Sequence, residues 1–310
     1  MRKIVVILLL LIFVLACKPT AKKEVKLESP YIGGSQGLSS EFFQLRKDVF
    51  DGGNDPFEIS VKLQNLGETP VKKEHVRVRI SGINPAEFGK TEDQLSTGSP
   101  DDIIEVRTGP TGTIQSPPTT VEFTNLNYKG QLAGASAQFP LRADICYLYR
   151  TEAVSKLCIR ADLLNPRPGG ICEVEGSKTL YSSGAPVQIS SFQEQTRAKD
   201  KVGFTFEVKN AATGSVFERN SACDRTDRRK ENRVYAIVNT GLSGLTCTGL
   251  ESTGKGAEGF VTLYGGSKIV TCTQTIVGRT DFEQLVNMEA IYDYEQTTQT
   301  SITVKSSGEE

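Results

Sequence analysis

The sequence predicts an all-β protein built from two tandem antiparallel β-sandwich domains. After residue 30 the apolar and polar residues alternate, as they do in Phe57–Asn65, and no stretch keeps a helical apolar stripe. Alternation with a period of two is typical of half-buried strands. Turn signals rich in Gly and Pro, such as the one at 51–56, separate these stretches. Many short strands with such turns favour sandwiches.

The N-terminus has the layout of a secretory signal peptide. Arg2 and Lys3 precede an apolar run from Ile4 to Ala16, and Cys17 follows. The run is short for a membrane span, which needs roughly 20 apolar residues. We therefore expect residues 1–16 to be a signal peptide.

The four residues at the end of this run resemble the bacterial lipobox, whose cysteine becomes the lipidated first residue of the mature protein. They read Val14-Leu15-Ala16-Cys17, and Val14 and Leu15 depart from the usual Leu and small residue. The resemblance implies lipidation at Cys17. The alternative is an uncleaved anchor that ends at Cys17, and both interpretations tether the rest of the chain outside the cytoplasm.

The remaining chain is divided by composition. Residues 17–30 are lysine-rich with little apolar pattern, which predicts a lipid-anchored flexible stalk. The breaker cluster Asn165–Gly170 separates a first sandwich domain at 31–165 from a second at 171–305. Residues 306–310 are expected to form a disordered tail.

The chain also resembles itself at an offset of 145 residues. Phe57–Asn65 aligns with Val202–Asn210, and the block 145–160 aligns with 290–305, with both tyrosines matching. One offset shared by two distant blocks indicates a tandem duplication. We interpret each closing block as a β-hairpin.

Six cysteines remain after Cys17, and an even number in an exported chain predicts three disulfides. They are Cys146, Cys158, Cys172, Cys223, Cys247 and Cys272. The expected hairpin places Cys146 opposite Cys158 and predicts a disulfide between them. The other four cysteines can pair in three alternative ways, and we favour the one with Cys172–Cys223 and Cys247–Cys272.

A strand that ends in Asn65-Leu66-Gly67, followed by the alternating stretch Val76–Ile80, resembles the immunoglobulin-like modules of the CARDB or NEW3 type. The second copy has Asn210-Ala211-Ala212 and departs from the N-x-G turn. The arrangement is similar to uncharacterised archaeal surface proteins. The resemblance implies two immunoglobulin-like sandwiches that act as spacers or adhesive units.

Several function classes fit the composition poorly. The formal net charge is −1, whereas nucleic-acid binding needs a basic surplus. A Ser-His-Asp hydrolase would depend on the single histidine, His75, which we expect to face solvent at the start of a strand. Asp101, Asp102 and Glu105 have the side chains of a glycosidase, but the chain has no Trp to stack on sugars.

Two further clusters have an ordinary explanation. Asp51, Asn54 and Asp55 could supply oxygen ligands to calcium, but these residues also form turns. The run Cys223–Arg233 is dense in charge of both signs and reads as a solvated loop, with an acidic partner or a sulfated glycan as the alternative.

The sequence thus predicts a non-enzymatic cell-surface lipoprotein that acts as a structural spacer, adhesin or partner-binding module. The expected partners are the membrane, through the N-terminal lipid or anchor, and a protein or glycan at the cell surface. No nucleic acid, cofactor or metal is expected. The alternatives are an extracellular glycan- or solute-binding lipoprotein and a hydrolase on a β-scaffold.

Overall fold

A computed structural model describes residues 28–165, 169–252, 256–278 and 280–308. The chain divides into two units, residues 1–30 and residues 31–310, and the second unit is compact. The expected signal peptide, Cys17 and almost all of the expected stalk lie outside the described residues. In the described part, no helix is long and apolar enough to span a membrane.

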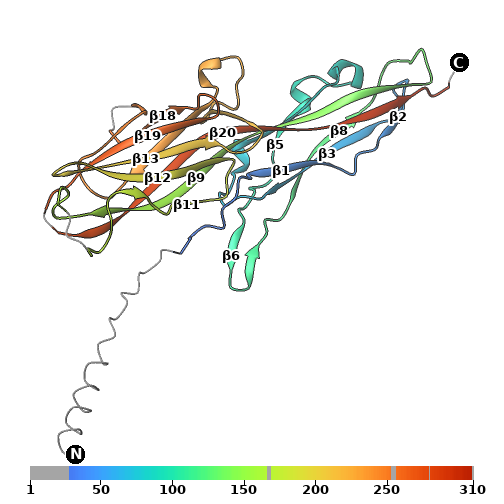
Figure 1. Cartoon of the computed structure of the whole chain (residues 1–310). Coiled ribbons are helices and arrows are strands. Elements are labelled where there is room, and N and C mark those ends of the chain that lie inside the picture. Colours follow the sequence, from blue (N-terminus) through green and yellow to red (C-terminus); the bar gives the residue numbers. More distant parts are fainter. Residues whose placement is uncertain (1–27, 166–168, 253–255, 279, 309–310) are drawn as a thin grey trace, which may run out of the picture. The chain divides into compact units, whose positions relative to one another are not determined.

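Residues 31–310 form an all-β unit, as the alternation predicts (Figure 1). The strands of the first repeat are β1 (Leu38–Phe43), β2 (Asp48–Phe50), β3 (Phe57–Asn65), β4 (Val76–Ser81), β5 (Ser96–Gly98), β6 (Arg107–Gly109), β7 (Gly112–Ile114), β8 (Thr119–Leu126) and β9 (Ser136–Ile159). Those of the second are β10 (Gly176–Ser177), β11 (Tyr181–Ser182), β12 (Val187–Ala198), β13 (Lys201–Asn210), β14 (Ser215–Glu218), β15 (Arg233–Asn239), β16 (Leu245–Thr248), β17 (Glu251–Ser252), β18 (Glu258–Thr262), β19 (Ser267–Thr275) and β20 (Phe282–Lys305). Short 3-10 helices occur at η1 (Lys73–His75), η2 (Pro85–Phe88), η3 (Asp93–Leu95) and η4 (Arg228–Lys230).

Two smaller sheets pack on one large sheet. The first repeat contributes the order β1-β3-β8, and the second contributes β10-β12-β13-β19-β16. The large sheet has the central order β17-β18-β15-β20-β9-β4-β5, and β2, β11 and β14 pair with its two long strands. The strands β6 and β7 form a separate hairpin that projects from the body (Figure 1).

The large sheet is nearly symmetric about its middle. β9 and β20 are both 24 residues long and pair antiparallel over their whole length. On one side lie β4 and β5, and on the other lie β15 and β18, which hold corresponding places in the two repeats. The two repeats therefore meet along β9–β20 as two halves of one sheet.

Hydrogen bonds of two asparagines and two tyrosines show that the repeats are built alike. Asn65 Nδ2 donates to Thr69 O at 2.7 Å, and Asn210 Nδ2 donates to Gly214 O at 2.9 Å. The hydroxyl of Tyr147 accepts from Leu38 N at 3.2 Å, and that of Tyr292 accepts from Val187 N at 3.1 Å. Asparagine and tyrosine both recur at the 145-residue offset.

The expected closing hairpins are wrong. Residues 145–160 hold no turn, because β9 continues unbroken from Ser136 to Ile159, and β20 likewise runs through 290–305. The two blocks pair with each other instead of folding back on themselves. Both long strands therefore run through both repeats, and the large sheet does not divide at the expected boundary near Asn165.

All six expected cysteines form disulfides, but two of the three pairings differ from the expected ones. The bonds are Cys146–Cys223, Cys158–Cys172 and Cys247–Cys272. The prediction of Cys146–Cys158 is wrong because it depended on the hairpin, and Cys172–Cys223 is wrong with it. Cys247–Cys272 is confirmed, since those residues lie directly opposite each other in β16 and β19.

The core is continuous across the two repeats. Four tyrosines, Tyr147, Tyr149, Tyr292 and Tyr294, are almost fully buried where β9 and β20 cross the middle of the unit. Their rings pack edge-on or tilted, with centroids 5.7 to 6.5 Å apart. Burial raises the pKa of each of these hydroxyls. Through this cluster the two repeats pack into one unit.

Candidate functional site

A cleft of about 520 Å³ lies on the outer face of the large sheet, where the two repeats meet. We call it the junction cleft. Its lining comes from η1, β4 and β5 on one side, from the middle of β9 and β20 below, and from the loop after β14 on the other side. The lining residues are Glu74, His75, Val76, Arg77, Ser96, Thr97, Gly98, Cys146, Leu148, Asn220, Ala222 and Asp293.

One wall of the cleft is a strap, residues 219–226, that crosses the outer face of β9 and β20. The disulfide between Cys146 on β9 and Cys223 on the strap joins the first repeat to the second. Beneath the strap, Phe217 is 1% exposed and packs with this disulfide. Arg225 pairs with Glu295 of β20. The strap is therefore tied to the sheet by a covalent bond, a small apolar cluster and an ion pair.

The buried carboxylate of Asp293 shapes the strap. It accepts from Asn220 N at 3.0 Å, from Ala222 N at 2.7 Å and from Ser221 Oγ at 3.3 Å. Asn220, Ala222 and Cys223 all have positive φ angles. The N–H groups of Asn220 and Ala222 both reach the carboxylate, whereas Ser221 N donates to Glu218 O. Burial raises the pKa of Asp293, and these donors oppose the rise. The carboxylate thus occupies the concave side of the strap.

The residue types of a hydrolase meet in the junction cleft without forming its hydrogen bonds. Ser96, His75 and Asp293 all line the cleft. Among the hydrogen bonds of the described residues, none joins His75 to Ser96 or to Asp293, and the Asp293 oxygens are occupied by the strap. His75 is exposed, as the sequence predicts. A triad needs the base to be held between nucleophile and carboxylate, so the side chains shown here do not make one.

The acidic residues considered for glycoside hydrolysis do not converge. Asp102 pairs with Lys72 at 2.7 Å and accepts from Lys73 N, and these contacts hold the pKa of Asp102 below its usual value. Glu105 pairs with Arg107 at 3.3 Å. Asp101 is exposed. Asp102 and Glu105 are thus engaged in local ion pairs.

The turn considered for calcium is closed by protein donors. Asp51 accepts from Leu132 N and Ser307 N, both at 2.8 Å, and these bonds lower its pKa. Asp55 accepts from Phe50 N and pairs with Arg46 at 2.8 Å. Across the described residues, no group of three or more His, Cys, Asp or Glu side chains is arranged to hold a metal ion.

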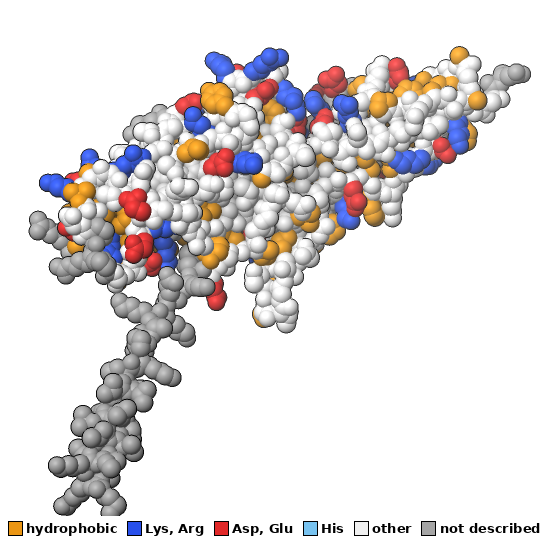
Figure 2. Space-filling model, in the orientation of Figure 1, with side chains coloured by type: hydrophobic (Ala, Val, Ile, Leu, Met, Phe, Trp, Pro, Cys, Tyr) orange, Lys and Arg blue, Asp and Glu red, His pale blue; other side chains and the backbone are white. Residues whose placement is uncertain are grey.

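The charged run Cys223–Arg233 forms ion pairs both within itself and with residues outside it. Arg229 pairs with Asp227 at 2.9 Å, and Arg233 bridges Glu218 and Glu251 at 2.6 and 2.7 Å. Figure 2 shows Lys and Arg intermingled with Asp and Glu over the upper surface in that view. Mixed pairing of this kind leaves little net field, as expected for a solvated loop.

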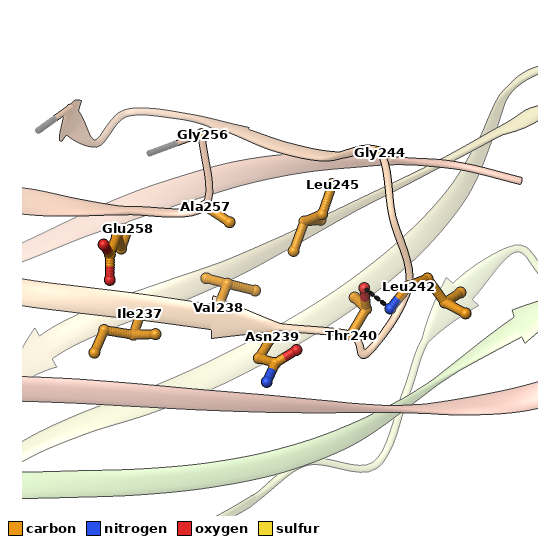
Figure 3. Close-up of a pocket in the computed structure, with 10 residues that line it drawn as sticks. All are labelled: Ile237, Val238, Asn239, Thr240, Leu242, Gly244, Leu245, Gly256, Ala257 and Glu258. Atoms are coloured by element: carbon orange, nitrogen blue, oxygen red, sulfur yellow. Dashed lines mark hydrogen bonds between the residues drawn. The ribbon is translucent and has the colours of Figure 1, made fainter. Parts of the chain in front are cut away.

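A second hollow, of about 470 Å³, lies in the second repeat between β15, β16 and β18 (Figure 3). Its lining mixes apolar and polar residues, with Val238 and Leu245 on facing elements and Glu258 at the end of the group. The polar bond drawn there joins Thr240 Oγ1 to Leu242 N at 3.3 Å and only closes the turn. This hollow brings together no reactive side chains.

Glu194 is a buried carboxylate that the sequence analysis missed. It lies on β12 with a fully buried side chain, accepts from Cys158 N at 2.9 and 3.0 Å, and lies 3.3 Å from Lys178 Nζ. Burial raises its pKa to about 7 against the effect of both donors. The sequence signal was a lone Glu in the strand 187–198, which is indistinguishable from a solvent-facing one.

Comparisons with known proteins do not place the chain in a family. No protein-family model and no curated protein match it. A chain from a study of the triple jelly roll fold and turret assembly in an archaeal virus is 10% identical, over 88% of this chain and 92% of that one, with a TM-score of 0.12. A chain of the Sulfolobus turreted icosahedral virus is 12% identical, over 86% and 91%, with a TM-score of 0.10. TM-scores this low do not indicate a shared fold.

Proposed function

We propose that this protein is an exported cell-envelope protein, anchored through its N-terminus, that presents a rigid β-structure to a partner at the cell surface. The observation that carries the proposal is the union of the two repeats into one unit. The β9–β20 ladder extends over 24 residues of each strand, a contour length of about 80 Å at the usual rise per residue. The Cys146–Cys223 disulfide adds a covalent link between the repeats.

The disulfides support an exterior location. Three bonds involving six cysteines are typical of proteins in oxidising compartments. The leader at 1–16 and the lipobox-like Cys17 would supply export and anchoring. The anchor and its lipid belong to the proposal.

Within the envelope, the path of the chain favours a binding or adhesive module over a serial spacer. Ile32 N and Gly33 N both donate to the Glu68 carboxylate at 2.8 Å, and Gly184 N donates to it at 2.6 Å. The chain therefore enters the folded unit where the two repeats meet. A spacer in series would be entered at one end, whereas entry at the middle leaves both ends of the unit available to partners.

The resemblance to CARDB or NEW3 modules is part of the same proposal. The Asn65 turn has Gly67 N donating to Asn65 Oδ1 at 3.0 Å, and the corresponding turn in the second repeat has Ala212 N donating to Asn210 Oδ1. The same turn thus forms with Ala in the glycine position. The shared turn supports two related modules, and their adhesive or partner-binding role is what the resemblance adds to the proposal.

Glycan or solute binding is the second candidate, and the junction cleft favours it. The cleft is large enough for a small ligand and carries Arg77, His75 and Ser96 as polar groups. A hydrolase on this scaffold is a weaker alternative, because the hydrogen bonds of a triad are not formed.

Export and anchoring are tested together by the intact mass of the full chain produced in a bacterial host with lipoprotein processing. We expect a mass that begins at Cys17, carries lipid and rises by six hydrogens on reduction. Cys17→Ser should be exported without lipid and released from the membrane fraction. A native chain with six free thiols, or one that stays in the cytoplasm, would sink the proposal.

A further inference from the structure

The first-repeat sheet lacks a strand that the second-repeat sheet has. In the order β1-β3-β8 the strand β8 is last, whereas β19, which holds the corresponding place, is followed by β16. The correspondence is set by register, because Val61 faces Val121 and Phe206, 145 residues later, faces Val270. β16 pairs antiparallel with β19 and is fixed to it by Cys247–Cys272. In the described chain, β8 pairs with β3 alone.

The path of the chain beside this sheet differs between the two repeats from Gly89 onward. In the second repeat, Thr275 N donates to Gly244 O at 3.2 Å, and the chain then continues along the edge of β19 as β16. In the first, Asn127 N donates to Phe88 O at 3.0 Å, but Gly89 takes a φ of 66° and ends η2. The chain turns away there, which leaves the outer edge of β8 without a strand.

The open edge has the properties of a strand that can be paired. Val121 and Phe123 face the core, 2% and 3% exposed, and Thr120 and Glu122 face outward. Glu122 is its one charged residue. Two prolines precede it at 117–118, and a bulge follows where Asn125 takes a φ of 57°. These features limit regular pairing to residues 119–123.

We propose that the outer edge of β8 pairs with β8 of a second copy of this chain, so that two three-stranded sheets form one six-stranded sheet. An antiparallel pair of identical strands is two-fold symmetric, which suits an isologous dimer. Centring the pair on Val121 places Thr120 opposite Glu122 of the second copy and Thr119 opposite its Phe123. Apolar side chains then remain on the core side and polar ones outside.

Neighbouring registers are less favourable. Centring on Glu122 would bring the two carboxylates face to face, and like charges directly opposite are destabilising. Centring on Thr120 would place Pro118 opposite Glu122, and proline cannot donate to a ladder. A shift by one residue would invert the faces of one copy. The Val121-centred register is the one we infer.

Substitutions at Thr120 separate dimerisation from folding. Within its own chain, Thr120 lies opposite Lys62, and across the proposed interface it lies opposite Glu122. Thr120→Glu should leave the monomer as stable or more stable but weaken the dimer about threefold to tenfold, because two Glu–Glu pairs form at each interface. Thr120→Lys should strengthen the dimer by a similar factor and weaken the monomer slightly.

The measurement is sedimentation velocity of the full chain in detergent micelles over a concentration series, with amide hydrogen exchange followed at residues 119–123. We expect a monomer–dimer equilibrium, slower exchange at these amides as dimer forms, and opposite shifts for the two variants. Arg197→Glu, on an exposed position of β12, is the control and should leave the equilibrium unchanged. A chain that stays monomeric, or a dimer that ignores both Thr120 variants, overturns the proposal. Neither outcome bears on export or anchoring.

Discussion

Leu148 lies directly opposite Asp293 in the β9–β20 ladder, and the same two residues are 145 positions apart in the sequence. They are therefore corresponding residues of the two repeats that face each other. This occurs only where a pseudo-two-fold axis passes between them. The two repeats thus pack as the subunits of an isologous dimer do, and the axis crosses the floor of the junction cleft. One repeat has kept an apolar residue on the axis and the other has a carboxylate that holds the strap.

Asp293→Asn should loosen the strap. The asparagine amide is neutral and has one acceptor oxygen where the carboxylate has two. Of the Asn220 and Ala222 N–H groups, one therefore loses its acceptor and the other keeps only an uncharged one. The expected cost is about 1–3 kcal/mol of unfolding free energy, measured in urea. Asp144→Asn is the control, because Asp144 accepts from the side chains of Ser81 and Thr297 at a more exposed place, and it should cost less than about 1 kcal/mol. Equal losses in the two variants would contradict the role given to Asp293.

Two of the three disulfides should differ in their effect on stability. Cys146–Cys223 closes a loop of 77 residues and Cys158–Cys172 one of 14. The chain-entropy model gives about 4.5 kcal/mol for the first and about 3 kcal/mol for the second. We expect Cys146→Ser with Cys223→Ser to lower the midpoint of urea unfolding more than Cys158→Ser with Cys172→Ser. The opposite order would show that the link between the repeats adds little to the β9–β20 ladder.

The alternation of residues predicted the local strands well and the long-range partners poorly. Phe57–Asn65 is a strand with the expected bounds, and its repeat at Lys201–Asn210 begins one residue earlier than expected. The hairpin expected within 145–160 failed because a 24-residue strand and a hairpin share the same alternation. The absence of Gly, Pro or Asn between Arg150 and Ser155 was the signal against a turn. The pairing of Cys146 depends on the strap, which comes from a distant part of the sequence and leaves no local pattern.

Stability should depend on pH through Glu194. The carboxyl titrates at about 7 in the folded protein and at its ordinary value of 4.5 in the unfolded chain. Between these values the folded state binds more protons, so the unfolding free energy should fall as pH rises through this window, by about 3–4 kcal/mol in total. Lys178, Glu175 and the Cys158 N–H are the groups that act on this carboxyl.

Glu194→Gln keeps an acceptor for the Cys158 N–H and removes the titration, so urea unfolding of this variant should vary less between pH 5 and 7.5. Glu58→Gln, at an exposed position of β3, is the control and should retain the native slope. A native protein whose stability rises over this range would contradict the effect of burial on Glu194.

Gly67 should tolerate no side chain. A Cβ at this position would collide with the side-chain hydroxyl of Tyr149 and with the backbone carbonyl oxygens of Gly184 and Gln36. Ala212 occupies the corresponding place in the second repeat, so the turn itself accepts alanine and the close packing at the junction does not. We expect Gly67→Ala to cost at least about 2 kcal/mol, as overpacking of a close-packed site does. Gly134→Ala, where no heavy atom lies within 4 Å of the added Cβ, should change the unfolding free energy by less than about 0.5 kcal/mol. If both variants unfold at the same urea concentration as the unsubstituted protein, the segment around Gln36 and the Asn65 turn are not packed against each other as described.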